Sequence, residues 1–409
     1  MDDEALLTKV RELVVPAMET QGRIEAWIVD DTGFVKKGVH SVGVARQYCG
    51  RLGKTDNPRR MRSIRPCQVA VSLSIANHEA SLPIAYRLYL PEEWANDAAR
   101  RMKAQVPDEV KFRTKPEIAL RQMKAALTAG VARGVVLADA AYGSDGEFRA
   151  GVTAMGLTYA VGVQSTITVW PAGQEPLPPK PWSGRGRKPS RVRRDAEHRP
   201  VSAKTLATTL PQEAWRDVSW REGSNQTLTS RFAALRIRPA SRDWKLAAPH
   251  PLEWLLIEWP EGEREPTKYW LSTLPEDTSI EVLADTAKLR WRIERDYEEL
   301  KSEFGLAHFE GRGWRGFHHH ATLCIATYGF LIRERAAFPS SGPRRLQGAV
   351  LSGRPRPRGA PDPTRAPRRE LDRHPAKATD RRPRQVALPM PVLPLVHAEA
   401  AALSPLMTQ

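Results

Sequence analysis

Acidic side chains follow two short apolar segments that have the composition of buried strands. Asp30 and Asp31 follow the first segment, residues 24–29, and Asp139 follows the second. Glu294 lies much later in the chain, within a helical pattern. Carboxylates from separate elements are ligands that magnesium prefers, and two such ions about 3.5–4 Å apart can activate water and stabilise the leaving oxygen in phosphodiester cleavage. The acidic residues therefore predict a site for metal-dependent phosphodiester chemistry.

The helical segment around Glu294 places two cations beside that carboxylate. At about 100° per residue, Glu294 lies ~40° and Lys301 ~20° around the helix axis from Arg290, so all three project from one stripe. A carboxylate flanked by two cations suits a metal site that lies beside a phosphate backbone.

The elements that must position these side chains alternate in a defined order. In chain order they are strands 24–29, 67–75 and 82–90, helix 115–127, strand 134–138, helix 146–155 and strand 157–163. The sequence Asp30-Asp31-Thr32-Gly33 predicts a turn after the first strand. Antiparallel strands followed by parallel crossovers predict a mixed sheet. The predicted fold class is α/β, in the ribonuclease H-like arrangement.

Five segments follow from this pattern. Residues 1–23 form a short N-terminal remnant, and residues 24–163 form the first part of the core. Strand-like pieces and tryptophans predict a β-rich insertion over 164–277. Residues 278–336 return to helix, carry Glu294 and complete the core, and the proline- and arginine-rich residues 337–409 predict a disordered tail.

The charge of the chain indicates an anionic partner, with nucleic acid first and a membrane surface second. The formal net charge is +16. Half of it belongs to residues 341–409, where 13 Lys and Arg stand against 5 Asp and Glu. A second basic stretch, residues 180–199, is a loop rich in glycine and proline, for which DNA contact and a solvated linker are equal alternatives. Its DNA-binding candidates are Arg185, Arg187, Lys188, Arg191, Arg193 and Arg194.

The remaining composition restricts compartment and metal chemistry. No run of about 18 apolar residues and no secretory signal is present, so we expect a soluble cytoplasmic protein with no membrane partner. The three cysteines, Cys49, Cys67 and Cys324, are too few and too scattered for a disulfide framework or a thiolate zinc site. Any metal is therefore expected to have oxygen ligands.

The segment with Arg290, Glu294 and Lys301 resembles the Tyr-x2-Arg-x3-Glu-x6-Lys signature of bacterial insertion-sequence DDE transposases. Four further segments, 29–38, 40–48, 138–143 and 310–320, are similar to the seven-hundred-and-one group of these elements, in the insertion-sequence-four-like superfamily. The matches run from about residue 24 to residue 336. Their order, with the β-rich insertion between them, makes the combination specific.

The resemblance implies a catalytic and metal-binding triad of Asp31, Asp139 and Glu294. Asp31 is preferred to Asp30 because the family's first aspartate precedes Thr and a small residue, and neighbouring strand residues face opposite sides, so only one can join the site. The family uses two Mg²⁺ ions, for which Mn²⁺ is expected to substitute, to nick element ends and join the freed 3′ hydroxyl to target DNA. The implied partners are double-stranded DNA and a second copy of the chain, in a bacterial cytoplasm and nucleoid-associated on DNA.

Departures from the family keep two alternatives open. Ala287 replaces the signature's tyrosine, and the N-terminal region is short. The tail is interpreted as translated out of frame, because synonymous codons for residues 363–376 can be chosen so that the neighbouring frame reads Arg-Pro-Glu-Arg-His-Val, which resembles the family's usual end. The first alternative is a truncated or frameshifted relic that only binds DNA, which the intact triad opposes. The second is a ribonuclease H-like nuclease without strand transfer.

Other polar motifs favour structural roles. His318, His319 and His320 point about 100° apart on a helix and cannot all bind one ion, so packing or phosphate contact is expected. Residues 311–316 predict a turn before the last helix, because the lysine and spacing of a phosphate-binding loop are missing. Most insertion tryptophans are expected in the core, and one is a candidate for stacking on an extruded base. The cations Lys36, Lys37 and Arg46 are equally suited to phosphate and to solvent.

Overall fold

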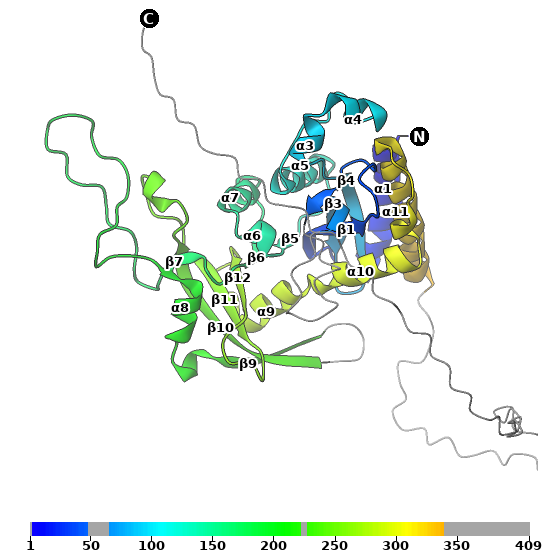
Figure 1. Cartoon of the computed structure of the whole chain (residues 1–409). Helices are drawn as coiled ribbons and strands as arrows, with labels where there is room; N and C mark the ends of the chain where they lie inside the picture. The colour runs from blue at the N-terminus through cyan, green and yellow to red at the C-terminus, as the bar shows by residue number, and fades with distance from the viewer. Residues whose placement is uncertain (1, 48–64, 222–226, 339–409) are drawn as a thin grey trace, which may run out of the picture. The chain divides into compact units, whose positions relative to one another are not determined.

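In the computed structural model, strand β1 (Ala26–Val35) pairs with a neighbour on each side. It is antiparallel to β3 (Arg65–Ala76) and parallel to β5 (Val135–Ala138). Beyond β5 lies the parallel strand β6 (Tyr159–Val163), and beyond β3 lies the antiparallel strand β4 (Ser81–Leu88). The mixed sheet predicted for an α/β ribonuclease H-like core is confirmed (Figure 1).

The structure describes residues 2–47, 65–221 and 227–338, which belong to the unit Met1–Gly342. The tail predicted to be disordered lies outside the described residues except at its first two positions, and Cys49 also lies outside them. Within the described ranges, no helix is both long enough and apolar enough to cross a membrane.

The turn predicted at Asp30–Gly33 is wrong. Strand β1 continues without a break through both aspartates to Val35, because each residue of this segment pairs with a residue of β3. The register places Asp30 opposite Ser72 and Asp31 opposite Val71. Both aspartates therefore lie inside a strand, where successive side chains point to opposite faces of the sheet.

Helices cover both faces of the core sheet. On the face of Asp31 lie α5 (Lys115–Thr128), α6 (Ala140–Gly143) and α7 (Gly146–Ala154), followed in the chain by β6. Helix α5 begins as predicted, with Pro116 in its first turn and a capping box in which Thr114 and Glu117 bond each other's backbone N–H groups. The short helices α3 (Glu92–Ala95) and α4 (Ala98–Lys103) precede it.

The opposite face is covered by α1 (Asp3–Gln21), α10 (Trp291–Ser302) and α11 (Trp314–Ala337). The segment expected to be a remnant is thus mostly a 19-residue helix that buries Val10, Val14 and Met18. Gly329 allows α1 and α11 to approach closely, since a Cβ atom there would lie 2.9 Å from Val10 Cγ1. The predicted last helix is confirmed as α11.

The β-rich insertion is confirmed, and its strands continue the core sheet. Its elements are β7 (Thr168–Trp170), β8 (Val201–Ser202), α8 (Ala203–Thr208), β9 (Arg216–Arg221), β10 (Thr227–Pro239), β11 (Glu253–Trp259) and β12 (Lys268–Ser272). Strand β12 pairs antiparallel with β6, with Leu271 opposite Val161. The small strand β2 (Ala45–Gln47) pairs with β3 on the other side of the core.

Helix α9 (Ile280–Lys288) packs on the insertion, where Leu283, Ala284 and Ala287 join a cluster with Trp220 and Phe232. The helical segment that follows the insertion is divided into two helices, because α9 ends at Lys288 and α10 begins at Trp291. Ala287, at the position of the signature's tyrosine, is buried in this cluster and lies on α9 rather than on α10.

Candidate active site

The two aspartates of β1 have different partners on the two faces of the sheet. Asp31 accepts a hydrogen bond from Lys115 Nζ at 2.6 Å and another from the Tyr142 hydroxyl. Asp30 faces α10, where its Oδ1 lies 3.4 Å from Arg290 Nη1. The expectation that only one of them belongs to the metal site is compatible with this division.

Asp139 lies at the end of β5, beside β1. It is the N-cap of α6, and its Oδ1 accepts hydrogen bonds from the backbone N–H groups of Ala141 (2.9 Å) and Tyr142 (3.4 Å). The last parallel pair of the ladder is Ile28 with Leu137, so the same register brings Asp139 level with Asp30. Asp30 and Asp139 therefore lie level with each other on neighbouring strands, and the predicted ligand Asp31 lies one residue further along β1.

Arg290 connects β1 to Glu294. Its Nη2 lies 3.4 Å from Glu294 Oε1, one turn further along α10, while Nη1 faces Asp30. Lys301 lies two turns beyond Glu294, and its ammonium is 5.5 Å from the centre of the Phe34 ring of β1. The predicted stripe of these three side chains is confirmed, and it lies toward β1.

Burial perturbs the acidic groups here. It raises the pKa of Asp30 to about 6, and Asp139 and Asp31 raise it further, whereas the Arg290 guanidinium lowers it. Burial also raises the pKa of the Tyr142 hydroxyl well above its usual value, and the negative charge of Asp31 adds to that effect. The pKa of a buried acid rises because desolvation disfavours its charged form. Burial is therefore the main cause of the raised pKa values at this site, and the neighbouring carboxylates add to it.

The described residues contain no group of three or more His, Cys, Asp or Glu side chains gathered closely enough to hold a metal ion. Ion pairs contribute to this arrangement, because the Asp31 carboxylate is paired with Lys115 and the Glu294 carboxylate is paired with Arg290. The donor set nevertheless fits magnesium, since all three predicted ligands are carboxylates and Glu294 is 52% exposed. Ligation by this set would require Lys115 and Arg290 to release their carboxylates. It would also require Asp31 and Glu294, which now lie on opposite faces of the sheet, to come together, whereas Asp30 already faces α10.

The insertion holds the segment that leads into α10. Lys288 Nζ donates to both oxygens of Glu258, each at 2.8 Å, and lies 4.1 Å from the centre of the Trp220 ring. Lys288 and Glu258 are both buried. Because Lys288 precedes Arg290 by two residues, this anchor also fixes the start of α10.

One of the DNA-binding candidates in the basic loop has a structural role instead. Arg194 Nη2 lies 2.5 Å from Asp243 Oδ1 and 2.6 Å from the carbonyl oxygen of Ala240. Its guanidinium carbon also lies 5.8 Å from the centre of the Trp170 ring and 5.1 Å from that of Trp244. Arg193 is partly engaged, since its Nε donates to the carbonyl oxygen of Pro178. The remaining candidates, Arg185, Arg187, Lys188 and Arg191, are exposed.

The histidine run packs as predicted. His318 Nε2 accepts the backbone N–H of Leu88 at 3.2 Å, and burial lowers the pKa of His318 to about 4. His319 contacts Asp3, and His320 contacts the carbonyl oxygen of Gly305, so the three rings point to different places. Trp182 and Trp244 are exposed, whereas the other insertion tryptophans are buried or half-buried.

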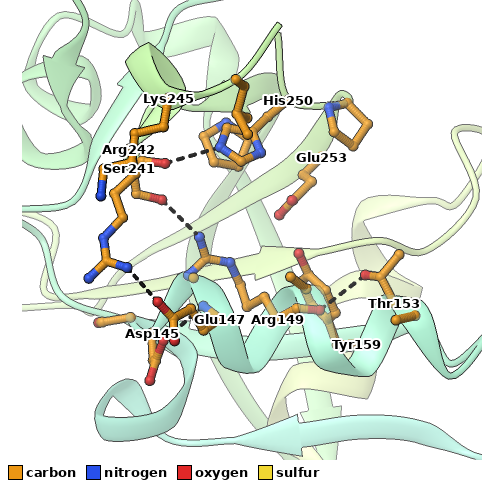
Figure 2. A pocket seen from close by; sticks show the side chains of 17 residues that line it. Asp145, Glu147, Arg149, Thr153, Tyr159, Ser241, Arg242, Lys245, His250 and Glu253 are labelled. Atoms are coloured by element: carbon orange, nitrogen blue, oxygen red, sulfur yellow. Dashed lines mark hydrogen bonds and ion pairs between the residues drawn. The ribbon is translucent and has the colours of Figure 1, made fainter. Parts of the chain in front are cut away.

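A cavity of about 880 Å³ lies where α7 meets the insertion. Figure 2 shows its lining, in which Arg149 donates to Ser241 Oγ and Arg242 pairs with Glu147. The lining begins at Ser144, just after α6, and includes neither Asp31 nor any other predicted ligand. The cavity is therefore separate from the carboxylate site.

Sequence reasoning missed Lys115 and Tyr142. Lys115 carries a weak signal, because it is the first residue of a helix whose start was predicted. Tyr142 follows Asp139 by three residues, but nothing in its spacing indicates that its hydroxyl reaches Asp31.

A family profile and the sequence of one known protein match this chain. The profile described as "DDE superfamily endonuclease" matches residues 1–227, a range that contains Asp31 and Asp139 and ends before Glu294. The chain is also similar to a protein of Microchaete diplosiphon described as "Probable transposase for insertion sequence element IS701". The two are 34% identical over 165 residues, which is 40% of this chain and 38% of that relative's length.

Proposed function

The chain belongs to the DDE superfamily of endonucleases, and from this premise we propose that it is a transposase. It would cleave DNA at the ends of an insertion sequence and transfer the freed 3′ ends into target DNA. The observation that carries this proposal is that Arg290 joins Asp30 of β1 to Glu294 of α10, while Asp139 follows the neighbouring strand β5 at the level of Asp30. The similarity to a probable transposase supports it.

The proposed metal ligands are Asp31, Asp139 and Glu294. When bound, two Mg²⁺ ions, or Mn²⁺ in their place, would activate a water or the 3′ hydroxyl of the DNA and stabilise the leaving oxygen. The residues of the chain orient this chemistry. Asp139 is already fixed by two backbone N–H groups, and Lys115 holds Asp31 in its present rotamer.

Asp30 has a different role in this proposal. It is 17% exposed, against 27% for Asp31, and it is already paired with Arg290. The planar guanidinium of Arg290 matches the geometry of a carboxylate, so the pair is suited to hold both side chains in place. We assign Asp30 as a positioning residue, which holds Arg290 and through it the side chain of Glu294.

The proposed partner is double-stranded DNA, both as element end and as target. Lys301 and Arg290 lie on the same stripe as Glu294, where they can contact the phosphates next to the scissile bond. Residues 180–191 supply further cations. A second copy of the chain is the proposed partner in the active complex, because two element ends have to be cut together, and on DNA the protein would associate with the nucleoid.

The test uses duplexes that carry the terminal repeats found beside the coding sequence, with Mg²⁺ and a supercoiled plasmid target. Glu294→Gln should abolish nicking while DNA retention at low salt stays nearly unchanged, because only metal chemistry is removed. Glu298→Gln, an exposed change on the same helix, is the matched control. Full activity of Glu294→Gln would refute the assignment.

The products separate the alternatives. Joined products from 3′-hydroxyl ends identify a transposase, and nicks without joining identify a nuclease. Retention of DNA with neither product identifies a relic that only binds DNA.

A further inference from the structure

A slender basic arm extends from the insertion between β7 and β8. We define the arm as residues 180–191, all of which are exposed. It contains no Asp or Glu, and Figure 1 shows the long connection after β7 to which it belongs. Its cations are Lys180, Arg185, Arg187, Lys188 and Arg191. Among the described residues, none of these cations is in an ion pair, so their charge is available to an outside partner.

The base of the arm is fixed to the insertion. Leu177 and Arg193 exchange two backbone hydrogen bonds of 3.0 and 2.9 Å, and the N–H of Val192 donates to the carbonyl oxygen of Leu246 at 3.0 Å. Asp243, whose side chain is 1% exposed, accepts from both Arg194 and Trp170 Nε1. The arm is therefore presented from a defined point of the fold.

The centre of the arm alternates arginine with glycine. Gly184 and Gly186 have φ angles of +84° and +73°, and a Cβ atom at either position would meet nothing within 4 Å. Packing therefore does not demand these glycines; they give the arm its turns and a thin backbone on both sides of Arg185. The Trp182 indole, 53% exposed, donates from Nε1 to the carbonyl oxygen of Gly186 at 3.2 Å and closes the turn.

From these features we infer that the arm binds the minor groove of A·T-rich DNA, with Arg185 and Arg187 inserted into the groove. The inference rests on the proposed function in so far as DNA is the partner. A B-DNA minor groove is only about 6 Å wide, so an inserted segment has to be thin. A·T tracts narrow this groove further and strengthen its negative potential, which attracts arginine.

Contact with phosphates alone explains the charge of the arm but not its shape. Phosphates bind any exposed cation and need no glycine between arginines. The flanking cations Lys180, Lys188 and Arg191 are placed to contact the two backbones while the central arginines occupy the groove. Gly186 between Arg185 and Arg187 lets the chain lie close to the groove floor.

The test measures binding of the full chain, in EDTA, to two labelled duplexes of equal length whose centres are an A·T tract or a G·C tract. We expect a preference of about tenfold for the A·T duplex, lost when netropsin occupies the minor groove. The double variant Arg185→Lys, Arg187→Lys keeps the charge but loses the planar guanidinium groups. It should reduce the preference to about twofold or less, with the salt dependence retained.

The matched control is the double variant Lys180→Ala, Lys188→Ala, which should weaken binding to both duplexes equally and keep the preference. Equal affinity of the unchanged protein for the two duplexes would overturn the inference and leave a phosphate-binding arm. A lysine variant that keeps the full preference would also overturn it. Absence of binding to either duplex would instead contradict the proposed function.

Discussion

Replacing Asp30 by Asn should stabilise the protein at neutral pH while it impairs catalysis. Burial raises the pKa of Asp30 from 3.8 to about 6. In the pH window between these values the unfolded chain ionises this carboxyl while the folded chain still holds the proton, so the free energy of unfolding falls as pH rises. A rise from 3.8 to about 6 corresponds to about 3 kcal/mol. Asparagine cannot ionise and removes this cost.

The magnitude can be measured from the thermal unfolding of the full chain in EDTA between pH 4 and pH 8. The difference between Asp30→Asn and the unchanged protein should be near zero at pH 4 and reach about 3 kcal/mol above pH 6, or roughly 6 °C in Tm for a chain of this size. Asp277→Asn, an exposed substitution, is the control and should show no such trend.

The same variant should lower end cleavage, because Arg290 loses the anion that directs it toward Glu294. Binding of Mn²⁺ separates positioning from ligation. We expect Asp30→Asn to bind the metal nearly as well as the unchanged protein, whereas Asp31→Asn should not bind it. A pH-independent loss of stability in Asp30→Asn, or loss of Mn²⁺ binding, would contradict the role assigned to Asp30.

Two further predictions concern the insertion and the histidine run. Arg194→Ala should lower the free energy of unfolding by about 3 kcal/mol, because it leaves the buried Asp243 carboxylate without its cation. The control Arg191→Ala, an exposed arm variant, should change the free energy of unfolding by less than about 0.5 kcal/mol. Equal effects of the two variants in chemical denaturation would exclude the structural role of Arg194. His318→Gln should reduce acid sensitivity, because burial lowers the pKa of His318 from 6.5 to about 4. The neutral His318 imidazole contributes stability that is lost as pH falls from 6.5 toward 4, by about 3 kcal/mol in total. Parallel curves of Tm against pH for the variant and the unchanged protein would contradict this prediction.

The order of the core elements could be read from the sequence because it depends on local signals. The apolar runs at β3, β4 and β6 and the capped start of α5 each carry their own pattern. The stripe of Arg290 and Glu294 was also predictable, since it depends only on helix geometry. These features need no knowledge of distant residues.

The partners of the site residues depend on long-range pairing and could not be predicted. Asp-Asp-Thr-Gly has the composition of a turn, but pairing with β3 keeps it in a strand. Asp31 meets Lys115 and Tyr142, which lie 84 and 111 residues away in the chain. Arg194 looked like the other loop cations, and only its contact with Asp243, 49 residues away, distinguishes it.

The pairing of β12 with β6 has a consequence for any attempt to shorten this protein. A strand that loses its neighbour presents unpaired N–H and C=O groups, which recruit other chains into intermolecular sheets. Removing the insertion would make β6, with its buried Tyr159, Val161 and Val163, an exposed edge strand of this kind. A minimal catalytic fragment would therefore need a substitute strand or charged residues along β6 to remain monodisperse.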